Sequence, residues 1–341
     1  MRHRALSRPI FPYYTGARLT THIQGERCPS NFTNIAGEIF GSNVTAESLW
    51  PFGASASATR FAYVFYATEK EYLCSAVVNF RQLCSVNVAG EIALIYPATW
   101  DQKYPVGSTS TTRRMLDRAH EEYRVNLHPV KLWRTEGEKT WSSSLTKLHI
   151  FGLADYTRLI YLDSDALVLR NLYHLFLPPW AQIALPRAYW LDEKDEKKLT
   201  SHIMVIAPSD SLMSRYVKNA SSPPFDMEVV NALSASSALI LPHRRYALLT
   251  GEFRCSNHTR YLAEEGPEAE WDPSIELSQA FYIHFSDWPF PKPWIRATED
   301  QIEKFQPECD PKEKTKCWNR QHWQSVYDLY HAIQDEVCIT L

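Results

Sequence analysis

The most constraining feature of the sequence is an apolar run that carries two aspartates, Arg158 to Leu169. Its first half, Leu159 to Leu162, predicts a strand buried on both faces, as in a parallel sheet. Aspartate is rare in strands, and a buried carboxylate without a partner is costly. Because residues two apart in an extended chain point to the same side, we expect Asp163 and Asp165 to hold one divalent cation between them. The carboxyl end of such a strand is also where open α/β sheets bind ligands.

Strands and helices alternate over the first 170 residues, which indicates βαβ units and a mostly parallel central sheet flanked by helices, an α/β fold. We expect strands at residues 61–68, 91–96, 130–133, 159–162, 182–185, 202–207 and 238–241 and helices at residues 71–83, 112–123, 144–153, 210–218 and 227–233. Apolar residues at helical spacing from Trp323 to Val337 predict an amphipathic helix near the end. Residues 1–58 are rich in Pro, Gly, Ser, Thr and Ala and predict an irregular N-terminal arm before a single domain at 59–341.

The composition excludes several classes of protein. The chain has 341 residues, of which 45% are hydrophobic and 22% charged, as is typical of soluble globular proteins. The formal net charge is −3 and there is no basic tract, so nothing indicates binding to nucleic acid. No stretch approaches 18 consecutive apolar residues and the basic start has no apolar segment behind it, so neither a transmembrane helix nor a signal peptide is expected.

Several catalytic motifs are absent from the sequence. It has no G-x-x-x-x-G-K-[ST], no G-x-G-x-x-G, no H-E-x-x-H and no G-x-S-x-G, which removes the main support for P-loop, dinucleotide-binding, zincin and α/β-hydrolase sites. The seven cysteines form no C-x-x-C pair, so zinc and thioredoxin-type sites have no support. Cys309 and Cys317 flank a short polar loop and are expected either to form a disulfide in an oxidising compartment or to stay reduced.

A second cluster of polar residues follows a short predicted strand at residues 282–283. His284 can supply a nitrogen ligand to a cation that two carboxylates already hold, and Lys292 offers a point charge suited to a phosphate. Three prolines around Lys292 stiffen this loop. Taken alone, the segment is typical of a proline-rich aromatic turn packed on the core. Taken with the two aspartates, it predicts a mixed oxygen and nitrogen site, which suits manganese better than calcium.

Four segments in this order resemble glycosyltransferase family 8, the glycogenin-like retaining enzymes. They are Trp141–Leu148, Leu162–Asp165, Phe225–Asn231 and His284–Trp294. The likeness is strongest to the fungal branch that includes Golgi α-N-acetylglucosaminyltransferases, and it covers roughly residues 60–341. It implies a GT-A (Rossmann-like) fold, a UDP-sugar donor and dependence on manganese, or alternatively magnesium. It further implies transfer of a sugar, with N-acetylglucosamine favoured, to an acceptor hydroxyl with retention of configuration.

The resemblance also implies roles for individual residues. It assigns three residues to the metal ion: Asp163, Asp165 and His284. It assigns five to the nucleotide and its diphosphate: Ala67, Thr68, Tyr72, Ser164 and Lys292. It places two beside the transferred sugar as the catalytic pair: Lys147 and Asp226.

Each assignment has a structural alternative. Tyr72 could simply pack the first helix on the sheet, and Lys147 could be a solvated helix charge. Asp226 could cap the helix that begins at Met227. Asp287 resembles a fourth ligand but is more typical of a surface turn. Where many members carry Asn-Ser-Gly before the next strand, this chain has Thr200-Ser201-His202, so a sugar contact from that asparagine is not carried over.

Two other functions remain open, a non-catalytic nucleotide-sugar-binding protein of the same fold and a nucleotide-sugar hydrolase. A structural protein, in which the two aspartates only cap turns, is a third. The resemblance implies the Golgi lumen, while the absence of a recognisable anchor leaves a cytoplasmic location as the alternative. A dimer also stays open. The acceptor is expected to be a glycan or glycoconjugate.

Overall fold

The structure is a computed structural model that describes residues 60–134, 143–177, 181–219, 225–266, 269–309 and 317–339. The arm expected at residues 1–58 lies outside these ranges, as do Trp141 and Ser142 of the first family segment. Among the helices that the structure describes, none has both the length and the apolar character needed to cross a membrane.

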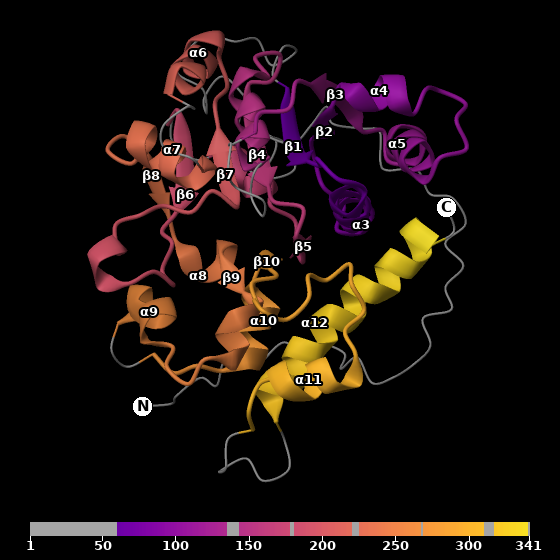
Figure 1. Cartoon of the computed structure of the whole chain (residues 1–341). Coiled ribbons are helices and arrows are strands. Elements are labelled where there is room, and N and C mark those ends of the chain that lie inside the picture. Colours follow the sequence, from indigo (N-terminus) through magenta and orange to yellow (C-terminus); the bar gives the residue numbers. More distant parts are fainter. Residues whose placement is uncertain are drawn as a thin grey trace, which may run out of the picture.

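A seven-stranded sheet forms the centre of the molecule, with strand order β3-β2-β1-β4-β7-β6-β8 (Figure 1). Its strands are β1 Phe61–Tyr66, β2 Glu91–Pro97, β3 Asn126–Val130, β4 Arg158–Leu162, β6 Ile183–Pro186, β7 Ile203–Ile206 and β8 Leu239–Leu241. All pairings are parallel except the two that β7 makes, with β4 and with β6. The predicted mostly parallel α/β sheet is therefore confirmed.

Both faces of this sheet are covered, which explains why its strands are apolar without alternation. Tyr63 and Phe65 of β1 join one buried cluster with α3 (Lys70–Ser85) and the C-terminal helix α12 (Trp318–Gln334). Ala62 and Val64 face the other way, into a second cluster. That cluster includes the 3₁₀ segment Ser144–Gly152, α6 (Asp210–Asn219) and α7 (Asp226–Ser234).

A second, three-stranded sheet joins segments that are far apart in the sequence. In it β10 (Tyr282–His284) lies between β5 (Ala166–Val168) and β9 (Leu248–Leu249). The antiparallel register of β10 and β5 places His284 opposite Ala166, directly after the two aspartates. Figure 1 shows this small sheet between the large sheet and the C-terminal helices. This pairing is what brings the imidazole to the acidic pair.

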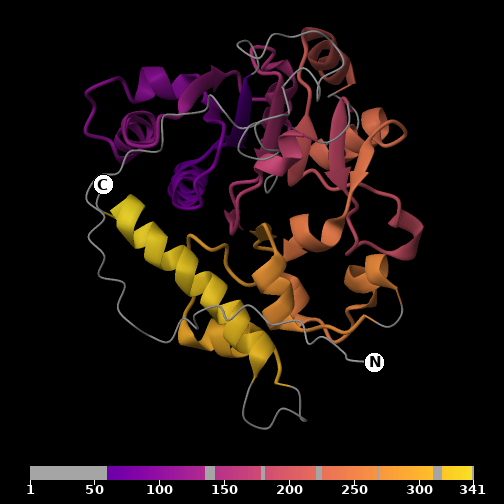
Figure 2. The same ribbon diagram turned by 180° about the vertical axis from the view of Figure 1, so that it is seen from behind.

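The remaining elements surround these two sheets, and Figure 2 shows the same arrangement from behind. The helices are α4 Thr99–Lys103, α5 Thr111–Glu121, α8 His243–Tyr246, α9 Thr259–Leu262, α10 Pro273–Gln279 and α11 Glu299–Phe305. Single helical turns occur at Tyr173–Phe176, Glu193–Asp195, Thr250–Arg254, Ala263–Glu265 and Asp335–Ile339.

Disulfide bonds constrain the C-terminal region. Cys74 in α3 is bonded to Cys338, which follows α12, across a sequence separation of 264. Cys309 is bonded to Cys317. The sequence left the second pair open between a disulfide and two thiols, and the structure contains the disulfide.

Two expected elements differ from those in the structure. The strand expected at residues 130–133 is β3 instead, Asn126–Val130, and it contains Pro129. A proline is tolerated there because β3 is the edge strand of the sheet. The helix expected at residues 144–153 is a 3₁₀ segment, Ser144–Gly152.

Candidate active site

The two aspartates lie in a bend between β4 and β5, at the carboxyl end of β4. The chain is therefore bent here rather than a continuous strand, yet the two carboxylates still reach the same side, because their oxygens belong to one cluster of possible ligands. Ser164 between them is buried, and its hydroxyl donates to the carbonyl oxygen of Tyr66 at 2.8 Å. Because Tyr66 is the last residue of β1, this bond ties the bend to the carboxyl ends of two neighbouring parallel strands. That edge is where sheets of this kind bind ligands.

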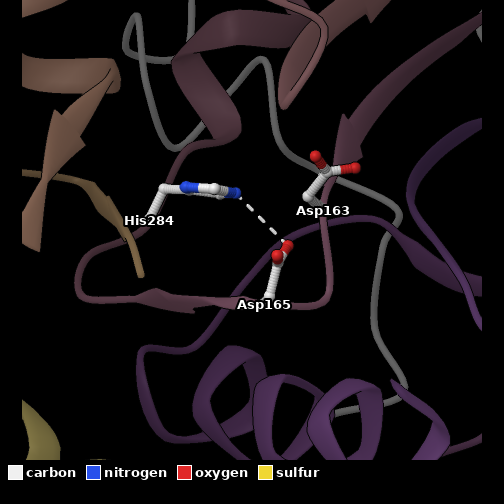
Figure 3. A group of neighbouring side chains, drawn as sticks. All are labelled: Asp163, Asp165 and His284. Carbon is white, nitrogen blue, oxygen red and sulfur yellow. Dashed lines mark ion pairs between the residues drawn. The ribbon is translucent and has the colours of Figure 1, made fainter. Parts of the chain in front are cut away.

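His284 completes a compact group with the two aspartates (Figure 3). One ligand atom from each of the three residues lies within 4.8 Å of the others. The His284 Nε2 is 3.3 Å from Oδ1 of Asp165. Two ligand atoms at right angles on an ion about 2.1 Å away lie about 3 Å apart, so this spacing suits a small divalent cation. Two carboxylates and an imidazole are also a donor set that manganese accepts.

Each aspartate has a lysine partner of its own. Lys292 places its Nζ 2.7 Å from Oδ2 of Asp165 and 3.1 Å from the carbonyl oxygen of Phe285, with 40% of its side chain exposed. Lys147 places its Nζ 2.8 Å from Oδ1 of Asp163 and is only 4% exposed. Tyr161 donates to the same Oδ1. The lysine and tyrosine contacts thus involve Oδ1 of Asp163 and Oδ2 of Asp165, while Oδ1 of Asp165 faces the His284 Nε2.

Burial and the neighbouring charges together shift the pKa values of the two aspartates in opposite directions. Burial raises the pKa of Asp163 above its ordinary value, although Lys147 opposes the shift. Burial would also raise the pKa of Asp165, but Lys292 and His284 outweigh it and hold that pKa well below its usual range. Asp165 is therefore the anionic anchor of the group.

Asp226 belongs to the same group through Lys147. Its Oδ2 lies 2.8 Å from the Lys147 Nζ and accepts a 2.5 Å hydrogen bond from the Ser201 hydroxyl. Asp226 is itself the first residue of α7, and no side-chain capping bond occurs at that helix start. Neither structural alternative therefore holds, because Lys147 is buried rather than solvated and Asp226 does not cap its helix. Burial lowers the pKa of Lys147, but Asp163 and Asp226 reverse that effect and raise it well above its ordinary value.

The residues expected at the nucleotide lie along the same edge. Ala67 and Thr68 follow directly on β1, and Ala67 is fully buried. Tyr72, on the first turn of α3, packs its ring at 4.6 Å from the ring of Trp294. This ring contact joins α3 to the loop that carries Lys292. The structure brings all ten expected site residues to this one edge of the sheet.

A buried polar network beneath the bend was not anticipated. The Ser75 hydroxyl donates to the carbonyl oxygen of Ser164 at 2.6 Å and accepts from the Tyr330 hydroxyl of α12 at 2.9 Å. Asn79 donates to the carbonyl oxygen of Ala166 at 2.8 Å and accepts from the amide of Val168. The sequence does carry a signal for this network. Ser75 and Asn79 are four residues apart, so they lie on one face of the helix, and they are polar where that face is otherwise apolar.

Asp287 is also placed differently from the expectation of a surface turn. It is buried, and its Oδ2 accepts from Trp323 Nε1 at 3.0 Å and from the Tyr327 hydroxyl at 2.8 Å. Arg254 lies 3.4 Å from its other oxygen. Asp287 therefore anchors the loop after His284 to α12 and is not part of the cluster that Asp163, Asp165 and His284 form.

Two further aromatic contacts reach the site. Tyr161 stands two residues before Asp163 on β4, and strand alternation could have identified it as a neighbour on the same side. His202 stacks on His284 with ring centroids 4.9 Å apart. Burial lowers the pKa of His202 well below its ordinary value. No pattern in the sequence indicates this second imidazole.

The chain is similar to fungal proteins named glucose N-acetyltransferase 1. It is 40% identical over 286 residues to the one from Gibberella zeae, covering 82% of this chain and 63% of that protein. It is 36% identical over 302 residues to the one from Aspergillus fumigatus, covering 82% of this chain and 77% of that protein. The chain thus spans just under two thirds of the first relative and about three quarters of the second. A scan against models of protein families found no match.

Among solved structures, the glycosyltransferase GlyE of Streptococcus pneumoniae has a TM-score of 0.50 at 16% identity, over 82% of this chain and 63% of that one. At this identity the likeness concerns the fold alone. It identifies the sheet and its helices as a GT-A glycosyltransferase fold, as expected from the sequence.

Proposed function

The chain belongs to the family of fungal proteins named glucose N-acetyltransferase 1, and from this premise we propose that it transfers N-acetylglucosamine from a UDP-sugar to a hydroxyl group of a glycan or glycoconjugate. We take the family name to denote transfer of the N-acetylated sugar, because the GT-A fold is a scaffold for glycosyl transfer. The observation that carries this proposal is the convergence of Asp163, Asp165 and His284 at the carboxyl edge of the sheet. Retention of configuration and dependence on Mn²⁺ belong to the same proposal.

The residues fit a divalent cation, which Asp163, Asp165 and His284 would hold. When bound, such an ion acts as a Lewis acid and template on the diphosphate of the donor. The charge balance supports this fit, since Lys147 and Lys292 each contact one oxygen of an aspartate, and the other oxygen of Asp165 faces the Nε2 of His284, itself an expected ligand. An ion in that position would join two carboxylates that otherwise repel each other.

Lys292 is suited to the leaving diphosphate. Its side chain is 40% exposed, so the ammonium group can turn from Asp165 toward a bound phosphate without opening the core. As the bond to the sugar breaks, negative charge grows on the diphosphate and the Lys292 charge stabilises it. Ala67, Thr68 and Tyr72 line the adjacent edge, where we place the uridine.

Asp226 and Lys147 are assigned to the sugar side of the site. Lys147 stays protonated between two carboxylates and fixes the orientation of both. Asp226 then offers negative charge close to a sugar carbon that becomes oxocarbenium-like. Lys147 already engages Asp226, so we propose attack by the acceptor hydroxyl on the same face rather than a covalent sugar intermediate on that carboxylate.

We further propose that the protein works in the Golgi lumen. Disulfides persist in oxidising compartments and are rare in the cytosol, and this chain contains Cys74–Cys338 and Cys309–Cys317. The two bonds favour the secretory pathway over the cytoplasmic alternative.

A donor screen tests the proposal. The protein is incubated with Mn²⁺, an oligosaccharide acceptor pool and one of several UDP-sugars, and both released UDP and glycosylated product are measured. We expect glycosylated product with UDP-N-acetylglucosamine, and little UDP release when the acceptor is left out. We expect Asp165→Asn to abolish product formation and the UDP release that accompanies it.

The other outcomes separate the alternatives. UDP release at the full rate without acceptor would identify a hydrolase. Binding of UDP-sugar with no release would identify a non-catalytic binder. Acetylation of glucose by an acetyl donor, with no transfer from any UDP-sugar, would contradict the proposed reaction.

A further inference from the structure

The metal ligand His284 lacks the support that a ligating histidine usually has. Such a histidine normally donates its second ring nitrogen to a carboxylate or carbonyl, which fixes the orientation of the ring. The Nδ1 of His284 is buried, and within the described part of the chain it has no hydrogen-bond partner. Its Nε2 lies 3.3 Å from Oδ1 of Asp165 and would be taken up by a bound ion, so the orientation of the ring on that ion depends on contacts other than a hydrogen bond from Nε2.

His202 supplies this support through its ring. The imidazoles of His202 and His284 stack with centroids 4.9 Å apart and planes inclined by 28°. The indole of Trp190 stacks on His202 in turn, at 5.4 Å and 27°. His202 is 4% exposed, so its ring is buried between Trp190 and His284.

The backbone of His202 ties together the two strands that carry the metal ligands. Its carbonyl oxygen accepts from the amide of Asp163 at 2.9 Å, directly after β4. The same oxygen accepts from the Tyr282 hydroxyl at 3.1 Å, in β10. One residue therefore contacts Asp163 with its main chain and His284 with its side chain.

We propose that His202 is a positioning residue, which orients the imidazole of His284 toward the metal by ring stacking rather than by a hydrogen bond. The Nε2 of His202 supports stacking as the means, because it too is buried and has no partner among the residues described. The inference rests on the proposed metal site. It gives a role to the histidine of Thr200-Ser201-His202, the segment in which this chain departs from the family 8 pattern.

Three variants separate stacking from other roles. His202→Phe keeps an aromatic ring without nitrogens, His202→Leu keeps bulk without an aromatic face, and His202→Ala removes both. The control is His258→Ala, because His258 also stacks on an aromatic ring, that of Trp271 at 4.2 Å and 11°, and is not one of the expected site residues. Mn²⁺ affinity is measured in the presence of UDP from the electron paramagnetic resonance signal of the free ion, without turnover.

We expect His202→Phe and the control to bind Mn²⁺ as the unchanged protein does, and His202→Leu and His202→Ala to bind about 10-fold to 100-fold more weakly. Equal Mn²⁺ affinity in the unchanged protein and in all three His202 variants would overturn the inference. So would a loss in His202→Phe as large as in His202→Ala, since a nitrogen would then be required. If His202→Phe does not fold, Trp190→Leu is measured instead. Because Trp190 stacks on His202, its loss should weaken Mn²⁺ binding, and an affinity equal to that of the unchanged protein would contradict stacking.

A second readout needs no metal. In crystals of metal-free His202→Ala, we expect the His284 ring to have turned away from Asp165, and an unmoved ring would count against the inference. An unchanged protein that binds no Mn²⁺ would instead refute the metal site on which the proposed function depends, and the ring orientation would still report on stacking.

Discussion

Two lysines balance the negative charge of the aspartates at the site, and they differ in how exposed they are to solvent. Lys147 is almost fully buried between Asp163 and Asp226, whereas Lys292 is substantially exposed beside Asp165. Removing a buried lysine leaves uncompensated charge in the core, whereas water can take the place of an exposed lysine beside its carboxylate. Lys147 should therefore contribute mainly to the stability of the fold, and Lys292 mainly to catalysis.

We expect Lys147→Met to lower the free energy of unfolding by about 3–5 kcal/mol, because two buried carboxylates lose their cation. Lys292→Met should change it by no more than about 1 kcal/mol and yet reduce kcat about 100-fold. Urea denaturation and steady-state kinetics measure both. A Lys147→Met protein as stable as the unchanged one would contradict the charge balance described here.

At this scale the sequence predicted that Asp163, Asp165 and His284 lie together, because residue type is informative there. Two carboxylates in an apolar run and a distant histidine identified Asp163, Asp165 and His284 before their contacts were known. The same reasoning missed Asp287 as a buried anchor, because nothing in its segment reveals that Trp323 and Tyr327 return to meet it. Long-range partners of a polar residue are not encoded in its neighbours.

At the scale of elements, helix α3 holds the bend between β4 and β5 from below. Asn79 makes hydrogen bonds to the main chain of Ala166 and Val168, and Ser75 to that of Ser164. These backbone groups are buried, so no water replaces a lost partner. The helix thereby sets the position of both aspartates.

We expect Asn79→Leu to destabilise the protein by about 2–4 kcal/mol and to weaken Mn²⁺ binding, because the bend loses its support from α3. Arg81→Ala is the matched control on the same helix, where Arg81 forms a surface ion pair with Glu336, and it should change neither quantity appreciably. Thermal unfolding and Mn²⁺ titration provide the measurements. Unchanged Mn²⁺ affinity in a folded Asn79→Leu protein would argue against support by α3.

The elements could be predicted where apolar runs were long and uniform. The central strands β1, β2 and β4 follow from such runs, and so do helices α3 and α12. The edge strand β3 was misplaced because it contains Pro129 and is only half buried, which removes the apolar signal. Strand β5 has three residues and exists through its pairing with β10, a contact that no local pattern predicts.

At the scale of the whole molecule, one disulfide joins the two ends of the described fold. Cys74 lies in α3 directly before Ser75, and Cys338 follows the last turn of α12. A bond across 264 residues restricts the unfolded chain far more than one across 8 residues, as between Cys309 and Cys317.

We expect the double variant of Cys74 and Cys338 to alanine to lose about 5 kcal/mol of stability on the loop-entropy account, and the matching variant of Cys309 and Cys317 about half as much. Guanidinium unfolding without reductant compares them. Equal losses from both pairs would contradict the entropic account.

The pH dependence of stability is also a property of the whole fold. Burial lowers the pKa of six histidines below 6.5, namely His128, His149, His174, His202, His322 and His331. The unfolded chain therefore binds more protons than the native protein near pH 6, so stability falls as the pH drops from 7 through that range.

We expect Tm to decrease steadily between about pH 7 and pH 5, the range in which a free imidazole takes up its proton. His128→Phe should make the decrease shallower, since its buried Nε2 has no hydrogen-bond partner among the described residues and the change loses little else. Calorimetry over this range measures the slope. A Tm that rises on acidification would contradict the assignment of these histidines as neutral in the native state.

The central claim is that Asp163, Asp165 and His284 together hold one divalent ion. Anomalous diffraction from crystals grown with Mn²⁺ and UDP tests it most directly. We predict a single strong manganese peak within coordinating distance of all three side chains, with Lys292 turned toward the diphosphate. A peak elsewhere, or none at saturating Mn²⁺ and UDP, would contradict the account.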